Sequence, residues 1–258
     1  MRLDSYLVAH GYTDSRERAK RLILARAVTL DGRVVDKPAT EVVGDPVIGV
    51  TEEEFVGRGG EKLKAALSLF DVDPTGARAL DVGASTGGFT HCLLANGARA
   101  VVALDAGCDQ LHPSLRADAR VTNIEKYNAR TLSQEDVGRF DLVVMDVSFI
   151  SATYILPRFP DVLLPDGKAI VLIKPQFEAG RGALNKKGIV KDGRDRMFAI
   201  SRVLNAAREV GLVCHGLAPS PIRGGDGNEE YLAFFTLYGE GIAERSVEKV
   251  VLEGKVST

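Results

Sequence analysis

The chain has 258 residues, of which 45% are hydrophobic and 26% charged, and its formal net charge is −2 at pH 7. This is the composition of an ordinary globular protein with enough apolar material for a core, and it excludes a protein coated in positive charge. A local basic surface remains compatible with it, because nucleic-acid binding needs only a positive patch.

The three cysteines are far apart and form no CxxC pair, so neither a disulfide framework nor a zinc site is predicted, and no other metal is expected. The opening MRLDSYLVAH carries charges and no long apolar run, which does not fit a secretory signal. No stretch approaches the roughly 20 apolar residues that cross a bilayer. We therefore expect a cytoplasmic protein that does not enter a membrane.

Residues 1–54 are predicted to form a small α+β domain. Apolar residues of MRLDSYLV share one face of a first short helix. Ser15 is a suitable N-cap for a second helix, RERAKRLILA, whose apolar residues recur at helical spacing. The alternating run VTLDGRVVDKP is centred on Asp31-Gly32, a dipeptide typical of a β-hairpin.

The second predicted helix carries a local excess of positive charge. Five basic residues lie in or just after it, opposed only by Glu17: Arg16, Arg18, Lys20, Arg21 and Arg26. Such a run is either a solvated helix face or a surface that holds RNA phosphates without reading the base sequence. We interpret it as the second, which predicts RNA binding by this domain.

The composition and the hydrophobic pattern of the sequence change after the first domain. The glycines of FVGRGG, residues 55–60, suggest a linker after the acidic run 51–54. Across residues 61–240 the apolar runs ARALDVGA, RAVVALDA, FDLVVMDVSFI and KAIVLIKPQF alternate with helical or loop segments, which predicts a parallel, doubly wound α/β sheet. RDRMFAISRVLNAAREVG predicts an amphipathic helix, and LVCHGLAP with YLAFFTLYG predicts an antiparallel pair at one edge. Residues 241–258 are a charged tail without a predicted element.

A glycine-rich turn joins the first of these strands to the following helix. Its sequence, DVGASTGGF, is not the GxGxxG of dinucleotide-binding folds, but its glycines allow a sharp turn and the close approach of a ligand. About 20 residues further on, the second strand ends in an acid placed to accept hydrogen bonds from ribose hydroxyls. The pattern resembles the S-adenosylmethionine (SAM) loop of class I methyltransferases; the alternative is a turn that serves chain geometry alone. The predicted cofactor residues are Asp81, Gly83, Ala84, Ser85, Thr86, Gly87, Gly88, Phe89 and Asp105.

Two charged residues, Asp146 and Lys174, end apolar strands, and both should reach a cleft because ligands bind at the carboxyl ends of strands in open α/β sheets. Lys62, in the helix after the linker, and Glu230, which opens the last strand, complete a candidate set. A ribose 2′-hydroxyl must lose its proton as it attacks a sulfonium methyl. Lys174 could take that proton, with the carboxylates orienting the lysines and Lys62 steadying the alkoxide. Each residue alone would more simply form a surface salt bridge, but the four together favour catalysis.

The order Lys62, Asp146, Lys174 and Glu230 resembles the K-D-K-E tetrad of FtsJ-like RNA ribose 2′-O-methyltransferases. More narrowly, RGGEKL, DVGASTGGFT, VVALDAG, DVSFIS, LIKPQFE and GNEEY resemble the TlyA (hemolysin A) family. The opening MRLDSYLVAHGYTDSRERAKRLI is similar to the RNA-binding domain named after ribosomal protein S-four. The resemblance implies a Rossmann-like class I methyltransferase fold and SAM as cofactor. It also implies transfer of a methyl group to the 2′-oxygen of cytidine in ribosomal RNA, free or in ribosomal subunits.

Some choices within this resemblance stay open. The family's glutamate directly precedes the aromatic residue of GNEEY, which favours Glu230 over Glu229. Phe177 and Arg181 are candidates for RNA contact, although Phe177 suits the core equally well. Three other function classes compete: a non-catalytic RNA-binding protein that keeps the fold, a membrane-lytic hemolysin and a small-molecule methyltransferase. The intact tetrad argues against a non-catalytic protein, and the lack of a membrane-spanning segment argues against a hemolysin. The basic N-terminal domain argues against a small-molecule methyltransferase.

Overall fold

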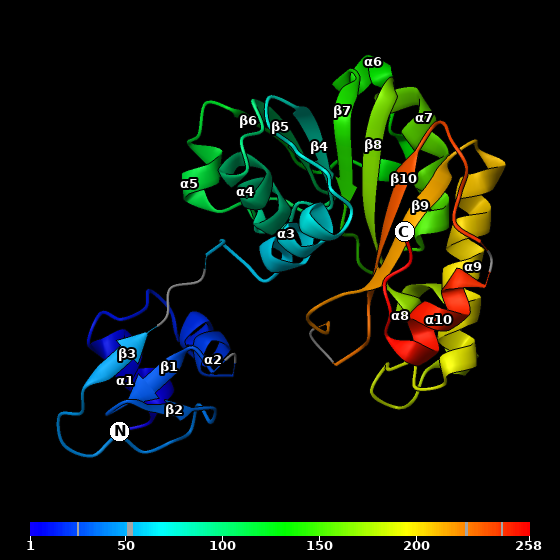
Figure 1. Cartoon of the computed structure of the whole chain (residues 1–258). Coiled ribbons are helices and arrows are strands. Elements are labelled where there is room, and N and C mark those ends of the chain that lie inside the picture. The colour runs from blue at the N-terminus through cyan, green and yellow to red at the C-terminus, as the bar shows by residue number, and fades with distance from the viewer. Residues whose placement is uncertain (25, 51–53, 225–226, 244) are drawn as a thin grey trace. The chain divides into compact units, whose positions relative to one another are not determined.

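The computed structural model describes residues 1–24, 26–50, 54–224, 227–243 and 245–258 (Figure 1). The chain divides into two compact units, Met1–Glu54 and Phe55–Thr258. Most of the acidic run before the expected linker, residues 51–53, lies outside the described residues. Each unit has its own apolar core.

The first unit has two helices and a small antiparallel sheet, as the sequence predicts. The helices are α1 (Leu3–Ala9) and α2 (Arg16–Leu24), and the strands are ordered β2 (Arg33–Val35), β1 (Val28–Leu30), β3 (Ile48–Val50). The Arg18 amide donates to Ser15 Oγ over 3.3 Å, which confirms the predicted cap. Asp31 and Gly32 form the two-residue hairpin turn with φ of +48° and +76°, the left-handed conformation that such turns require. The third strand was not predicted.

The second unit is built on one seven-stranded sheet, in the order β6-β5-β4-β7-β8-β10-β9 (Figure 1). From β6 to β8 the neighbours are parallel, whereas β10 runs antiparallel to β8 and β9. The predicted doubly wound sheet with an antiparallel pair at its edge is therefore confirmed. The strands are β4 (Arg78–Val82), β5 (Ala100–Leu104), β6 (Val121–Ile124), β7 (Phe140–Met145), β8 (Leu163–Ile173), β9 (Val213–Pro219) and β10 (Tyr231–Thr236).

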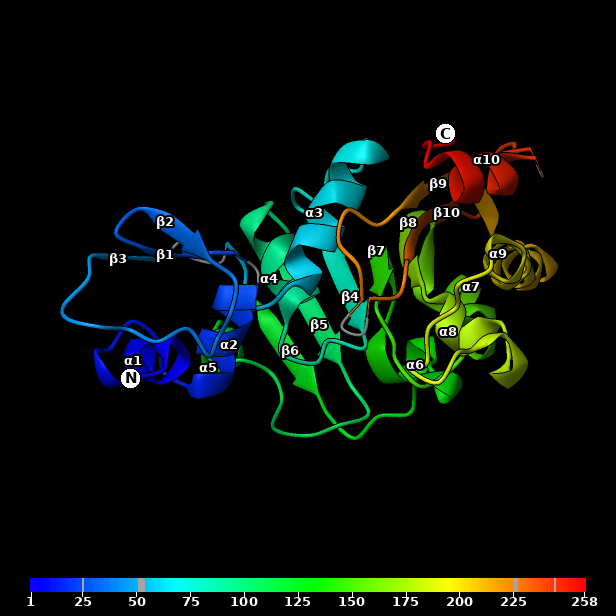
Figure 2. The same ribbon diagram turned by 90° about the horizontal axis from the view of Figure 1, so that it is seen from below.

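Helices cover both faces of this sheet (Figure 2). Successive strand residues point to opposite faces, so Ala79 belongs to the apolar cluster that includes α3 and α4, whereas Leu80 belongs to the cluster that includes α7, α9 and α10. The α-helices are α3 (Gly59–Leu69), α4 (Gly88–Ala95), α5 (Pro113–Arg116), α6 (Gln134–Val137), α7 (Phe159–Val162), α8 (Pro175–Glu178), α9 (Gly193–Glu209) and α10 (Ser246–Glu253). Short 3-10 turns are η1 (Ala129–Thr131), η2 (Ala152–Tyr154), η3 (Leu156–Arg158) and η4 (Arg181–Ala183).

Two segments that looked featureless in the sequence are part of the second unit's core. In the stretch 55–60, expected as a linker, the Phe55 ring is buried and α3 begins at Gly59. In the charged tail 241–258, α10 buries three valines and Ser257 bridges to Leu217 in β9. No helix among the described residues is long and apolar enough to cross a membrane.

Candidate active site

The chain reverses its direction of strand addition between β4 and β7, which lie side by side at the centre of the sheet. In open α/β sheets such a switch point opens a crevice at the carboxyl ends of the strands. The registers pair Val82 with Met145 and Ile173 with Tyr231, so the last residues of β4, β7 and β8 and the first of β10 share one edge. We call it the carboxyl edge.

Two ion pairs lie at the carboxyl edge, and of their four side chains all are buried except that of Asp146, which is half-buried. Lys62 Nζ is 2.5 Å from Glu230 Oε2, and these side chains are 9% and 3% exposed. Lys174 Nζ is 2.6 Å from Asp146 Oδ1 and donates to Ser148 Oγ over 2.8 Å. A lysine this deeply buried is tolerated only with a partner. These pairs are therefore not the exposed salt bridges that each residue alone would suggest.

Helix α3 brings the two pairs together. A Cβ on Gly59 would lie 3.7 Å from Asp146 Oδ2, so the first turn of α3 packs directly on the end of β7. Lys62 follows three residues later and lies on the same face of the helix. On the other side of the site, extending the β8–β10 register by one residue sets Glu230 opposite Lys174.

The adjacent glutamates of GNEEY have different partners. Glu229 accepts a hydrogen bond from Arg223 Nη2 over 3.0 Å and lies 3.3 Å from Arg196 Nε. Glu230 is the one paired with Lys62. The geometry therefore separates the two residues that the sequence left as alternatives.

A cavity of about 190 Å³ lies beside the Lys174–Asp146 pair. Much of its wall is the glycine-rich turn, and Asp146, Ser148 and Lys174 form another side. Sequence reasoning missed Ser148 and also Arg58, although both lie inside the motifs DVSFIS and RGGEKL. Six of the nine predicted cofactor residues line the cavity: Gly83, Ala84, Ser85, Thr86, Gly88 and Phe89.

The other three predicted cofactor residues, Asp81, Gly87 and Asp105, contact the turn or its flanking segments without lining the cavity. The Asp105 carboxylate accepts from the amides of Ser85 (2.8 Å) and Gly107 (2.7 Å). Gly87 has φ of +96°, and a Cβ there would meet the side chain of Leu115. Asp81 Oδ2 accepts a hydrogen bond from Thr90 Oγ1 over 2.7 Å.

Asp81 is fully buried, and its Oδ1 has no hydrogen-bond partner among the described residues. Burial raises the pKa of this carboxyl to about 7, against the lowering effect of Thr90. An orphaned carboxylate oxygen beneath a glycine turn is costly in the free protein. Its charge suits a cationic ligand such as SAM, which carries an ammonium and a sulfonium group.

We predict that Asp81 makes the stability of the ligand-free protein depend on pH. A carboxyl whose pKa is higher in the folded than in the unfolded chain binds its proton more tightly in the folded state. It therefore stabilises the fold fully at a pH below its unfolded pKa near 4, and this stabilisation is lost as the pH rises to about 7. Across this window the free energy of unfolding should fall by up to roughly 4 kcal/mol more in the native protein than in Asp81→Asn. Urea unfolding at pH 4.5 to 8 measures the difference; parallel curves for the two proteins would contradict it.

The loop after Asp146 exposes an aromatic ring at the same edge. Phe149 is 92% exposed and has φ of +64°, which is rare for a bulky residue. Its ring lies 5.4 Å from that of Phe177, which is half-buried and so belongs fully neither to the core nor to the surface. Glu178 anchors this loop, because Ser151 Oγ and the Ala152 amide both donate hydrogen bonds to its buried carboxylate.

A second cluster of interest lies in the first unit. The fully buried Asp4 carboxylate accepts two hydrogen bonds of 3.0 Å from Arg2 and two of 3.4 Å from Arg16. The hydrogen bond from Arg2 is the largest cause that lowers the pKa of Asp4 to about 2. Arg18 lies 3.6 Å from Asp14. Helical geometry places the predicted basic residues on two faces of α2 rather than one: Arg16 with Lys20, and Arg18 with Arg21. Arg26 follows the helix.

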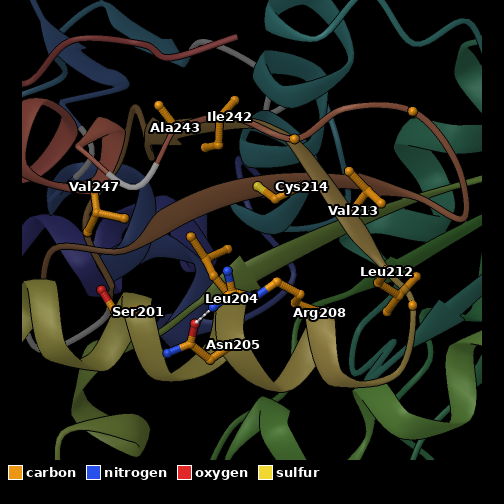
Figure 3. A pocket seen from close by; sticks show the side chains of 13 residues that line it. Ser201, Leu204, Asn205, Arg208, Leu212, Val213, Cys214, Ile242, Ala243 and Val247 are labelled. Carbon is orange, nitrogen blue, oxygen red and sulfur yellow. Dashed lines mark hydrogen bonds between the residues drawn. The ribbon is translucent and has the colours of Figure 1, made fainter.

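A larger cavity in the second unit, about 590 Å³, contains none of the candidate residues (Figure 3). It lies between α9, the start of β9 and the segment before α10, and is lined by residues such as Leu204, Arg208 and Cys214. Val213, also in its wall, pairs with Thr236 at the end of β10 remote from Tyr231. The cavity is thus remote from the carboxyl edge, and the candidate active site is chosen by its chemistry rather than by the size of its cavity.

Known proteins resemble this chain over nearly its whole length. Residues 55–237 match the model of the FtsJ-like methyltransferase family, and residues 1–47 match that of the S4 domain. The 16S/23S rRNA (cytidine-2′-O)-methyltransferase TlyA of Mycobacterium tuberculosis is 41% identical over 98% of each chain. Hemolysin A of Brachyspira hyodysenteriae is 41% identical over 92% of this chain and 100% of its own. A solved Streptococcus thermophilus structure, described as a candidate hemolysin, has a TM-score of 0.78 and 36% identity, covering 98% of this chain and 95% of that one.

Proposed function

The chain belongs to the FtsJ-like methyltransferase family, in its TlyA group, and from this membership we propose that it methylates a ribose 2′-hydroxyl of ribosomal RNA. SAM would be the methyl donor. A cytidine would be the acceptor, as the name of the mycobacterial relative states for that protein. The observation that carries the proposal is the pair of buried Lys174 with Asp146 beside the glycine-turn cavity, with Lys62–Glu230 at the same edge.

The cavity residues fit SAM, which supplies a methyl group on a positively charged sulfur. The turn from Gly83 to Phe89 would hold the cofactor, with Asp105 keeping the Ser85 amide in place and Asp81 providing negative charge below the turn. Because glycines leave the backbone bare, the ligand can approach the turn closely. Asp146, Ser148 and Lys174 in the opposite wall would face the acceptor ribose.

In the proposed reaction, Lys174 acts as the neutral amine: after its ammonium has released one proton to solvent, Nζ accepts the proton of the 2′-hydroxyl while the oxygen attacks the methyl carbon. SAM, when bound, would supply the methyl group from its sulfonium: the carbon–sulfur bond would break as the carbon–oxygen bond forms, leaving a neutral thioether and a methylated ribose. Asp146 and Ser148 fix the position of Nζ by contacts of 2.6 and 2.8 Å. Lys62, held by Glu230, stabilises the negative charge that develops on the oxygen. The exposed Phe149 ring offers a stacking surface for the target base.

Incubation with labelled SAM and separated, unmodified ribosomal subunits tests the proposal. Label should enter RNA, and mapping should place it on a ribose 2′-oxygen, with cytidine as the base. Label on a base atom would refute 2′-O transfer. SAM binding without transfer to either subunit or to free ribosomal RNA would favour the alternative of a non-catalytic RNA-binding protein.

The first unit is expected to contribute RNA affinity that is independent of SAM. Replacing Arg16, Arg18 and Lys20 by alanine should weaken RNA binding by about tenfold or more and flatten its salt dependence, because phosphate contacts release counterions. SAM affinity should not change, since the cofactor residues lie in the second unit.

The double variant Arg16→Lys/Arg18→Lys, which keeps the charge, is the matched control for this prediction. Filter binding from 50 to 200 mM salt gives the affinity and the slope. Normal affinity and an unaltered slope in the triple variant would show that these side chains are only solvated surface, and circular dichroism would exclude loss of the fold.

A further inference from the structure

A hairpin between α8 and α9 carries positive charge without compensation. The segment AGRGALNKKGIVK, residues 179–191, has no acidic residue and four basic ones: Arg181, Lys186, Lys187 and Lys191. Across the described parts of the chain, no ion pair joins any of these four to a carboxylate. The neighbouring Arg196 and Arg223 differ, since both lie against Glu229. An uncompensated positive surface is typical of a site for a polyanion.

Hydrogen bonds within the hairpin fix its turn. Leu184 and Val190 form an antiparallel bridge, and the Asn185 amide donates to Ile189 O over 3.0 Å. Asn185 Oδ1 accepts from the amides of Lys187 (2.8 Å) and Ile189 (3.0 Å). The backbone that presents the exposed Lys186 and Lys187 is therefore ordered before any partner arrives, which lowers the entropic cost of binding.

The hairpin is also tied to the active site. Asn228, which is buried two residues before Glu230, accepts from the Val190 amide over 3.1 Å and donates to Gly188 O over 3.0 Å. At its other end, the hairpin follows α8, which begins directly after Lys174. The turn is thus fastened to segments that carry two of the candidate catalytic residues.

We propose that Lys186 and Lys187 bind backbone phosphates of the RNA strand whose target ribose lies at Lys174. The inference rests on the proposed function, because it assumes that the substrate is RNA. Protein partners are usually held by apolar or aromatic anchors, and no residue of 179–191 is among the large apolar side chains that the described chain exposes. Adjacent cations on a rigid turn suit phosphates instead, which bind point charges without base recognition.

The test compares the full-length protein with Lys186→Ala/Lys187→Ala, using in vitro transcribed, unmodified ribosomal RNA and labelled SAM. The matched control, Arg139→Ala/Lys168→Ala, removes the same charge from residues just before β7 and within β8. We expect the hairpin variant to raise the KM for RNA by about tenfold and to reduce the salt slope of binding by about 1 to 2. Its kcat at saturating RNA should stay within about twofold of the native value, since Lys174 and Lys62 are untouched.

Three results would overturn the proposal. The first is an unchanged KM and salt slope in a hairpin variant tested beside an active native protein. The second is an equal loss in the control variant, which would indicate a general charge effect. The third is weaker binding to intact subunits with normal binding to naked RNA, which would assign the lysines to a ribosomal protein. Failure of the native protein to methylate or bind any RNA would instead defeat the proposed function itself.

Discussion

Replacing Lys174 by alanine is expected to lower the rate of methyl transfer by about a thousandfold, the scale of a general base at a poor nucleophile. The side chain would no longer accept the hydroxyl proton, whereas the glycine turn that would hold SAM is untouched. Single-turnover transfer from labelled SAM to ribosomal RNA measures the rate, and calorimetry should show nearly native SAM affinity. Lys168→Ala, a change in the same strand β8 but away from the carboxyl edge, should leave both unchanged.

The two adjacent glutamates provide an internal comparison for the same site. Glu230→Gln should slow transfer by about a hundredfold, because Lys62 would lose the carboxylate that fixes it. Glu229→Gln, which alters the contacts with Arg196, Arg223 and the Tyr231 hydroxyl but not the pair with Lys62, should cost little. Near-normal turnover in Lys174→Ala would remove that lysine from the mechanism. A larger loss in Glu229→Gln than in Glu230→Gln would show that the wrong glutamate has been assigned.

Gly83→Ala is expected to abolish SAM binding and to lower the free energy of unfolding by roughly 3 kcal/mol. Gly83 has φ of +86°, and a Cβ there would lie 2.6 Å from the carbonyl oxygen of Asp146 and 3.0 Å from Val147 Cγ1. The methyl group would therefore push the turn away from β7, which displaces both the cavity wall and Asp146. Urea unfolding and calorimetry with SAM measure the two effects.

Gly76→Ala separates backbone strain from this clash. Gly76 has a similar φ of +72°, but a Cβ there would meet nothing within 4 Å. The control should cost about 1 kcal/mol and leave SAM affinity unchanged. If both variants bound SAM equally well, the contact between the turn and Asp146 would not shape the cofactor site.

Most of the fold could be predicted because its signals are local. Asp31-Gly32 defines a hairpin through backbone conformation alone, and the apolar runs that become β4, β5, β7 and β8 reveal strands buried on both faces. The charged ends of β7 and β8 could be placed at one edge because parallel strands share their direction. The positions of Asp146 and Lys174 follow from these rules and from the resemblance to a known family.

What could not be predicted depends on contacts between distant segments. Phe55 looks like part of a flexible glycine-rich stretch until α3 and α4 form the apolar pocket that buries it. The valines of α10 lie in a charged tail, and only β9 and α9 give them a surface to pack on. Likewise, Asp105 ends a strand in the sequence, but its bond to the Ser85 amide arises from the folded turn. No local pattern indicates any of these contacts.

The Lys62–Glu230 pair joins residues 168 positions apart, in the first helix and just before the last strand of the second unit. During synthesis, the glycine turn, Asp146 and Lys174 all leave the ribosome before Glu230 does. The nascent chain can therefore form the glycine turn early, whereas the four candidate catalytic residues come together only when β10 has added to the sheet. A chain cut short before residue 230 would keep that turn but lack the partner of Lys62. By the proposed mechanism, such a truncated product is expected to be unable to methylate ribosomal RNA.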